Sequence, residues 1–210
     1  MKKIVLIGLL VVAIMFLGIG CASYNPRTGI PDVKTFQETG IKAVNAEAGI
    51  TIIAYPIQTK EDADVYFDNT SLAKDGLLPV YVSVSIGDIG NKNYRVETVF
   101  IQTESRSIPT ISAERAFVLI KKSYAGRMVA WGIWTYGIGY PISAAHTASV
   151  NSKIEKDLKE KEMKGESGFL YFKIPDNLES LDSYFLVFAL ADKDRNLTVK
   201  LPLKGNITAR

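Results

Sequence analysis

The sequence is short of the residues from which most metal and redox sites are built. Its 210 residues contain one cysteine, Cys21, and one histidine, His146. Because the single thiol precedes the folded domain predicted below, no set of zinc ligands can form within that domain. We therefore expect no cofactor and no metal ion.

Familiar catalytic motifs are also missing from the sequence. It has no G-x-S-x-G turn to carry a nucleophilic serine, and a Ser-His-Asp triad would have to use His146. The stretches GIGYP and GDIGNK lack the strand-loop-helix context and the lysine-hydroxyl ending of a phosphate-binding loop. These absences disfavour a hydrolase and predict a protein that is not an enzyme.

A strong excess of either charge is absent as well. The chain has 25 basic and 22 acidic residues, for a formal net charge of +3. Removal of a first segment containing Lys2 and Lys3 leaves 23 basic residues against 22 acidic ones, or +1. Nucleic-acid-binding domains usually carry a pronounced basic patch, so we predict no nucleic-acid partner.

What the sequence does have is a strongly apolar beginning, which has the layout of a signal peptide. Lys2 and Lys3 precede residues 4–19, which carry no charge and no strongly polar group. As a helix this run spans roughly 24 Å, which is shorter than the hydrocarbon core of about 30 Å that a permanent span must cross. We predict a signal peptide over residues 1–20; a signal-anchor that stays in the membrane is the alternative.

The apolar run ends in LGIGC (residues 17–21), with small residues directly before the cysteine. This ending resembles the lipobox of bacterial lipoproteins, although Gly18 stands where that family most often has leucine. The resemblance implies cleavage after Gly20, a diacylglyceryl thioether on Cys21 and acylation of the new amino terminus, which would make a stable membrane anchor. Ala22 follows instead of the aspartate that marks inner-membrane retention, so we expect the outer membrane, on its periplasmic or surface face. An unmodified cysteine beside an ordinary cleavage site is the alternative.

The rest of the chain divides into a tether and one domain. Residues 21–45 contain prolines and glycines with little apolar periodicity, which predicts a flexible tether. Residues 46–210 contain short runs rich in Val, Ile, Tyr and Phe between turn signals, which is typical of an antiparallel all-β domain. Seven strands of this length favour an immunoglobulin-like β-sandwich. The predicted strands are residues 49–57, 77–88, 94–103, 115–120, 168–174, 184–192 and 197–203.

One segment of this domain has a different composition and predicts an α-helical hairpin insertion over about residues 113–165. Residues 128–152 contain no Asp, Glu, Lys or Arg, and a charged helical pattern follows them. Glycines and a proline interrupt the uncharged run, and a membrane span there would separate later strands from their partners. We predict one helix from about Ala113 to Tyr136 and a second from about Ser143 to Lys164. The strand predicted at 115–120 overlaps the first helix, and both interpretations stay open.

The resemblance to bacterial lipoproteins extends beyond the lipobox. The stretches DVYFDNTSLAKDGLLPVYVSV and LKEKEMKGESGFLYFKIP, with the glycine- and alanine-rich insertion between them, resemble a group of uncharacterised envelope lipoproteins with a β-sandwich domain. This similarity covers most of residues 60–175. It implies a fold and brings no activity with it.

Four aromatic side chains in the insertion form the candidate binding surface: Trp131, Trp134, Tyr136 and Tyr140. Core contacts with the sandwich are one interpretation. The other is a surface that faces the membrane or an envelope protein partner, because Trp and Tyr favour places that are apolar at one end and wet at the other. The function predicted is that of a lipid-anchored envelope lipoprotein acting as a non-enzymatic binding or structural module. An envelope hydrolase or carbohydrate-binding module with an unrecognised site is the alternative.

Overall fold

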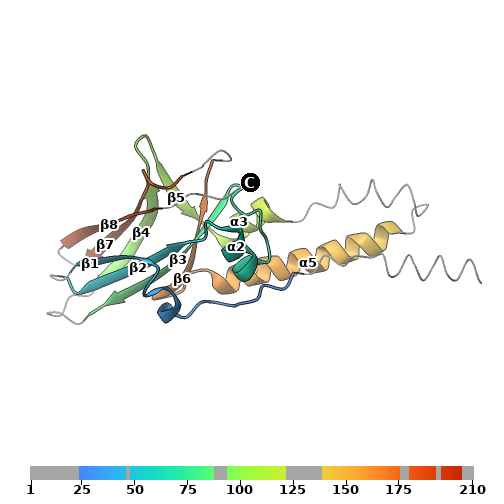
Figure 1. Ribbon diagram of the computed structural model, residues 1–210, viewed down its shortest axis with the longest axis horizontal. Helices are drawn as coiled ribbons and strands as arrows, with labels where there is room; N and C mark the ends of the chain where they lie inside the picture. The colour runs from blue at the N-terminus through green and yellow to red at the C-terminus, as the bar shows by residue number, and fades with distance from the viewer. Residues whose placement is uncertain are drawn as a thin grey trace, which may run out of the picture.

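The computed structural model describes residues 24–45, 48–87, 94–121, 139–175, 180–192 and 195–204, with the side chains of 139–146 and 195 left out (Figure 1). Within these ranges the chain forms strands and short helices. The strands are β1 (Ile41–Asn45), β2 (Ile50–Pro56), β3 (Leu77–Ile86), β4 (Arg95–Gln102), β5 (Ser107–Ile111), β6 (Ser167–Lys173), β7 (Phe185–Asp192) and β8 (Arg195–Pro202). The helices are the 3-10 helix η1 (Val33–Phe36) and the α-helices α2 (Lys60–Phe67), α3 (Ala113–Ile120) and α5 (Gly139–Lys161).

The strands form one antiparallel sheet of eight strands in the order β1-β2-β3-β6-β5-β4-β7-β8. The mainly antiparallel β fold predicted from the sequence is therefore confirmed. The arrangement differs from two separate sheets in one respect: β5 pairs with both β4 and β6, so the two halves are continuous. The end strands β1 and β8 also lie close together, which means that the sheet curls around a shared interior.

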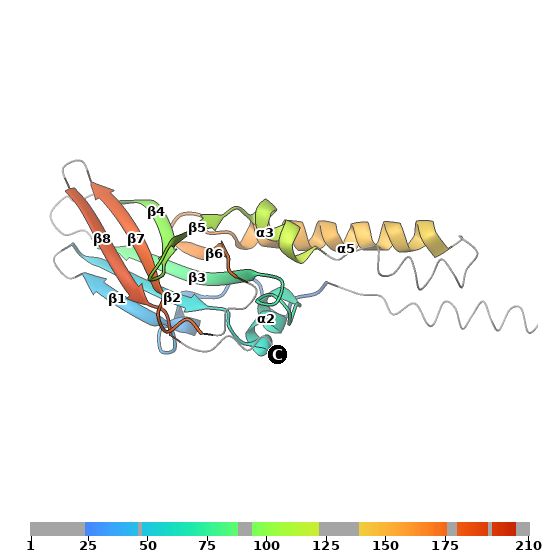
Figure 2. The same ribbon diagram turned by 90° about the horizontal axis from the view of Figure 1, so that it is seen from above.

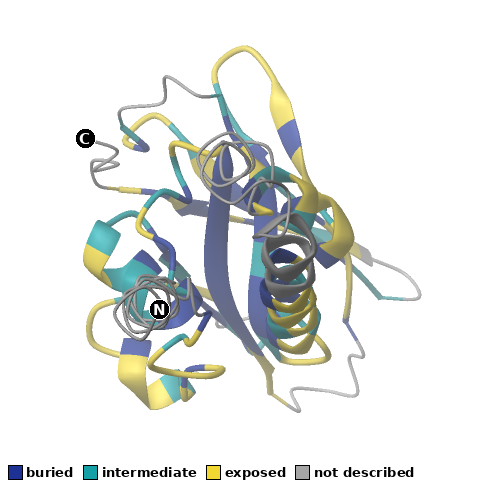
Figure 3. Cartoon of the chain, turned by 90° about the vertical axis from the view of Figure 1, so that its right-hand side faces the viewer, coloured by how far each residue is buried: buried dark blue, intermediate teal, exposed yellow. Residues whose placement is uncertain are grey.

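The half of the sheet formed by β2, β3 and β6 is covered on both faces. Its inner face packs against β4, β7 and β8 through residues such as Ile52 and Val82, which have no exposed surface. Its outer face packs against the helices through alternate residues such as Tyr81 and Phe169. Double coverage explains why residues 77–84 are all buried although their side chains alternate between faces. Figure 3 shows these buried strands beside the inward face of α5, whose exposed residues lie on the other side.

The prediction of a flexible tether over residues 21–45 is wrong for its described part, residues 24–45. Phe36 is buried, and its ring stacks on that of Tyr55 with centroids 4.2 Å apart. Residues 41–45 form β1 and pair with β2. We call residues 24–40 the strap, because they run across the outer face of the domain. Aromatic residues hold the strap down, since each buries a large apolar area.

The strand predicted at 115–120 is also wrong, and the overlapping helix that begins at Ala113 is correct. The side chain of Ser112 accepts from the backbone N–H of Arg115, which caps the first turn of α3. The buried residues Ala113, Ala116 and Ile120 recur at helical spacing, so one face of α3 meets the domain. The remainder of the first predicted helix lies outside the described residues.

The second predicted helix is present as α5, which begins four residues earlier and ends three residues earlier than expected. Glu162 already forms a β-bridge with Phe169, and this contact stops the helix at Lys161. Strands β1 and β5 and helix α2 were not predicted. Of the described helices, α5 included, none is long and apolar enough to cross a membrane.

Candidate functional site

Most of the binding residues predicted from the sequence lie outside the described residues. Cys21, Trp131, Trp134 and Tyr136 lie outside the described residues. Tyr140 belongs to the first turn of α5, but its side chain is outside the description. The lipid attachment site and the aromatic surface therefore stay predictions.

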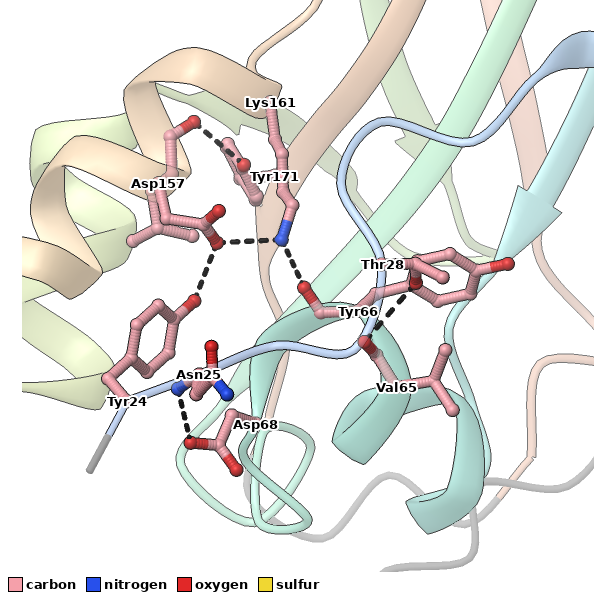
Figure 4. Close-up of polar contacts among 10 residues, drawn as sticks. Tyr24, Asn25, Thr28, Val65, Tyr66, Asp68, Asp157, Lys161 and Tyr171 are labelled. Carbon is pink, nitrogen blue, oxygen red and sulfur yellow. Dashed lines mark hydrogen bonds and ion pairs between the residues drawn. The ribbon is translucent and has the colours of Figure 1, made fainter. Parts of the chain in front are cut away.

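The described residues do contain a buried polar cluster that joins the strap, α2 and α5 (Figure 4). Its centre is Lys161, whose side chain is 1% exposed. The Lys161 ammonium donates to Asp157 Oδ2 at 2.7 Å and to the backbone carbonyl of Tyr66. The hydroxyl of Tyr24 donates to the same Asp157 Oδ2 at 2.6 Å. We call Tyr24, Tyr66, Asp157 and Lys161 the junction cluster.

Local structure accounts for the position of each member. Asp157 and Lys161 are one helical turn apart, so both side chains lie on the same face of α5. Tyr66 belongs to the last turn of α2, where backbone carbonyls have no partner within the helix. Lys161 supplies that partner, and a cation is favourable at the negative end of a helix dipole. The ring of Phe67 lies 5.0 Å from the ammonium and adds a cation-π contact.

Burial controls the electrostatics of the cluster. It lowers the pKa of Lys161, and the hydrogen bond to Asp157 opposes that shift. It also raises the pKa of Tyr24, and the bond to Asp157 raises it further, because an ionised phenol would lie against a carboxylate. Behind the cluster, burial holds the pKa of Tyr171 well above its usual range, and its hydroxyl donates to the backbone carbonyl of Leu158 at 2.9 Å.

This arrangement suits structural support better than chemistry. A lysine with a lowered pKa is a common general base or nucleophile, but the side chain of Lys161 is almost fully enclosed. Its ammonium is engaged by two protein acceptors. The cluster therefore fixes three chain segments to one another.

The residues that follow Tyr24 are also bonded to the domain. Each bond runs from the strap to α2 or to the residue after it, and Figure 4 draws the contacts of Asn25 with Asp68 and of Thr28 with Val65. They are Asn25 N–H to Asp68 Oδ2 at 2.8 Å, the Arg27–Asp64 ion pair at 2.8 Å, and Thr28 N–H to the Val65 carbonyl at 3.1 Å. The strap is thus attached from its first described residue onward.

A small hollow near the end of α5 is another candidate site. It has a volume of about 260 Å³ and lies between β5, β6 and Glu162. Small-molecule pockets usually have volumes of roughly 300–1,000 Å³, and Glu162 Oε1 already accepts from the backbone N–H of Ala113 at 3.0 Å. Within the described part of the chain, no group of three His, Cys, Asp or Glu side chains could hold a metal ion.

The junction cluster was missed in the sequence because its members belong to segments that look unrelated. Tyr24 fell within the predicted tether, and Asp157 and Lys161 fell within a charged helical pattern. One signal was present: Lys161 follows Leu158 by three residues, on the same stripe as the buried Val150 and Ile154. A charge on an apolar stripe indicates a buried, paired side chain.

The raised pKa of Tyr24 predicts how the stability of the protein changes at high pH. An unfolded tyrosine loses its proton near pH 10, whereas folded Tyr24 keeps it, so the unfolded state binds fewer protons above that pH. Stability is then lost as the pH rises, by about 1.4 kcal/mol per pH unit for one such group. We expect Tyr24→Phe to make this loss shallower by about that amount between about pH 10.5 and 11.5, measured by urea unfolding.

Lys161 affects the same measurement in the opposite direction. Its lowered pKa means that the unfolded state binds more protons below the ordinary lysine range, so stability rises with pH there. Both proteins keep Lys161, and comparison of their slopes therefore isolates Tyr24. Equal slopes for parent and variant would contradict both the burial of the Tyr24 hydroxyl and its bond to Asp157.

Comparison with known proteins assigns no family or function to the chain. No protein family model, curated protein or solved structure matches the chain.

Proposed function

We propose that the chain is a bacterial envelope lipoprotein, anchored through a lipid on Cys21, whose β domain acts as a non-enzymatic binding or structural module. The resemblance of residues 2–21 to a lipoprotein signal supports the anchor. The enclosed ammonium of Lys161, which donates to two protein acceptors, supports a structural rather than a catalytic use of the buried charges. The outer membrane, on its periplasmic or surface face, is the location we propose, with an envelope protein as partner.

The position of Tyr24 is the observation that carries this proposal. Tyr24 is 6% exposed and bonded to Asp157, and it follows Cys21 by three residues. Three residues span at most roughly 11 Å, so a lipid on Cys21 would attach the membrane almost directly to the domain. Such a protein would present its surfaces at a fixed height and orientation, which suits a module that docks a partner at the membrane.

Lipid attachment is tested by growth of expressing cells with radiolabelled palmitate. We expect the parent to incorporate the label and Cys21→Ser to lose it and to retain residues 1–20, because the variant has no thiol to modify. Ser23→Ala is the matched control, since it changes a neighbouring small residue and leaves the cysteine in place. Label in Cys21→Ser equal to that in the parent would rule out the anchor.

A further inference from the structure

We propose that the uncharged first half of α5, residues 139–152, enters the lipid bilayer beside the acyl chains of Cys21. This inference rests on the proposed lipidation of Cys21. It assigns a second, protein-based membrane contact to the same end of the molecule. The contact involves one leaflet and does not cross the membrane.

The direction of α5 is the first step of the argument. Figures 1 and 2 show α5 projecting away from the sheet, while the strap runs toward the same end of the molecule. The bond between Tyr24 and Asp157 gives the level at which the two segments meet. From Asp157, α5 continues for eighteen residues to Gly139, a rise of roughly 27 Å at about 1.5 Å per residue.

The reach of the anchor is the second step. Cys21 lies within roughly 11 Å of Tyr24 whatever path the chain takes. The far end of α5 therefore extends at least about 16 Å further from the junction cluster than Cys21 does. A lipidated cysteine lies at the membrane surface, where its acyl chains enter. With the sheet outside the bilayer and α5 directed toward it, the first half of α5 then reaches or passes that surface.

The charge pattern of α5 changes at the same level, and this is the third step. Residues 139–152 contain no Asp, Glu, Lys or Arg, whereas seven of the nine residues from Lys153 to Lys161 are charged. Lys153 is about 6 Å from Asp157 along the helix, well within the reach of Cys21. Burial of a charge in hydrocarbon is costly, so the charged half stays in water. The other half, in which polar side chains such as Ser149 and Asn151 are neutral, is the half that can enter the bilayer.

Exposed lysines at this boundary suit a membrane surface. Lys153 and Lys156 both lie on the exposed side of α5. Lysines at this height can place their ammonium groups among anionic headgroups while their stems lie along apolar surface. The uncharged half is about 21 Å long, which is less than the hydrocarbon thickness of about 30 Å. Insertion therefore stops within the bilayer.

The test measures the depth of two positions on α5 in the full-length lipoprotein. Ser149 and Glu160 are both exposed and lie on opposite sides of the charge boundary. Because the thioether blocks Cys21, a fluorophore on Ser149→Cys or Glu160→Cys labels one site only. The proteins are reconstituted into vesicles of phosphatidylethanolamine and phosphatidylglycerol. We expect quenching by aqueous iodide to be lost at position 149 and kept at position 160, and brominated lipid to quench only position 149.

Palmitate incorporation in the same preparations separates the two proposals. If palmitate is incorporated and iodide quenches both positions equally, the insertion of α5 is wrong and the lipoprotein proposal stands. If position 149 is protected from iodide and from brominated lipid alike, a protein surface covers it, which also overturns the insertion. If no palmitate is incorporated, the proposed lipid anchor fails and this inference fails with it.

Discussion

Asp157→Ala is expected to lower the free energy of unfolding by about 3–5 kcal/mol, as measured by urea denaturation. The substitution leaves the Lys161 ammonium, 1% exposed, without its counter-charge. It also leaves the Tyr24 hydroxyl without its acceptor. A buried charge that loses its partner costs more than the pair contributed, because the ammonium cannot regain water without opening the junction cluster.

Glu160→Ala is the matched control for this loss. Glu160 is also on α5 and carries the same charge, but its side chain is 61% exposed and its ion pair with Lys156 is 3.6 Å long. Exposed pairs contribute little, so we expect a change within about 0.5 kcal/mol. If the two substitutions cost the same, Lys161 is not held as a buried cation.

Lys161→Met distinguishes loss of the pair from loss of one partner. Methionine keeps an unbranched apolar stem and removes the buried charge. Asp157 keeps the bond from Tyr24, and its side chain is 19% exposed, so water can reach it. Replacement of a buried ion by an apolar residue is often close to neutral. The cost should therefore be smaller than that of Asp157→Ala, with part of it due to the Tyr66 carbonyl, which loses its donor.

Six of the seven predicted strands are present, as β2, β3, β4, β6, β7 and β8, because runs of Val, Ile, Tyr and Phe between turn signals are typical of strands. Alternation is clearest in β3, where β-branched residues recur at every second position from Val80 to Ile86. The short apolar run at 115–120 was ambiguous, since a run of this length fits a buried strand or one face of a helix. The cap at Ser112 is what selects the helix.

The strap and the junction cluster could not be predicted from local pattern. The overall composition of residues 21–45 hides the importance of two aromatic side chains, Tyr24 and Phe36, which are buried and hold the strap on the domain. The Tyr24–Asp157 bond joins residues 133 positions apart, and no sequence period reports such a contact. The sequence does contain the change from uncharged to charged residues at Lys153. Only the contact between Tyr24 and Asp157 relates the position of this change to that of Cys21.

The orientation of α5 depends on the close contact through which its end meets β6. Gly168 has a φ of 147°, and a Cβ there would lie 2.4 Å from Met163 Cα and 2.8 Å from Met163 N. Met163 cannot easily move away, because its N–H donates to the Phe169 carbonyl at 2.9 Å. This approach links the residues that follow α5 to the strand beneath the helices, so only glycine fits.

Gly168→Ala is therefore expected to lower the free energy of unfolding by about 3 kcal/mol or more, as measured by urea denaturation. Gly165→Ala is the matched control, because Gly165 also has a positive φ, 74°, but nothing lies within 4 Å of its added Cβ. That control should cost about 1–2 kcal/mol from backbone strain alone. The difference between the two variants measures the clash with Met163 together with the additional backbone strain at a φ of 147°. Equal costs would mean that α5 and β6 can separate without penalty, and that the direction of α5 is not fixed at this contact.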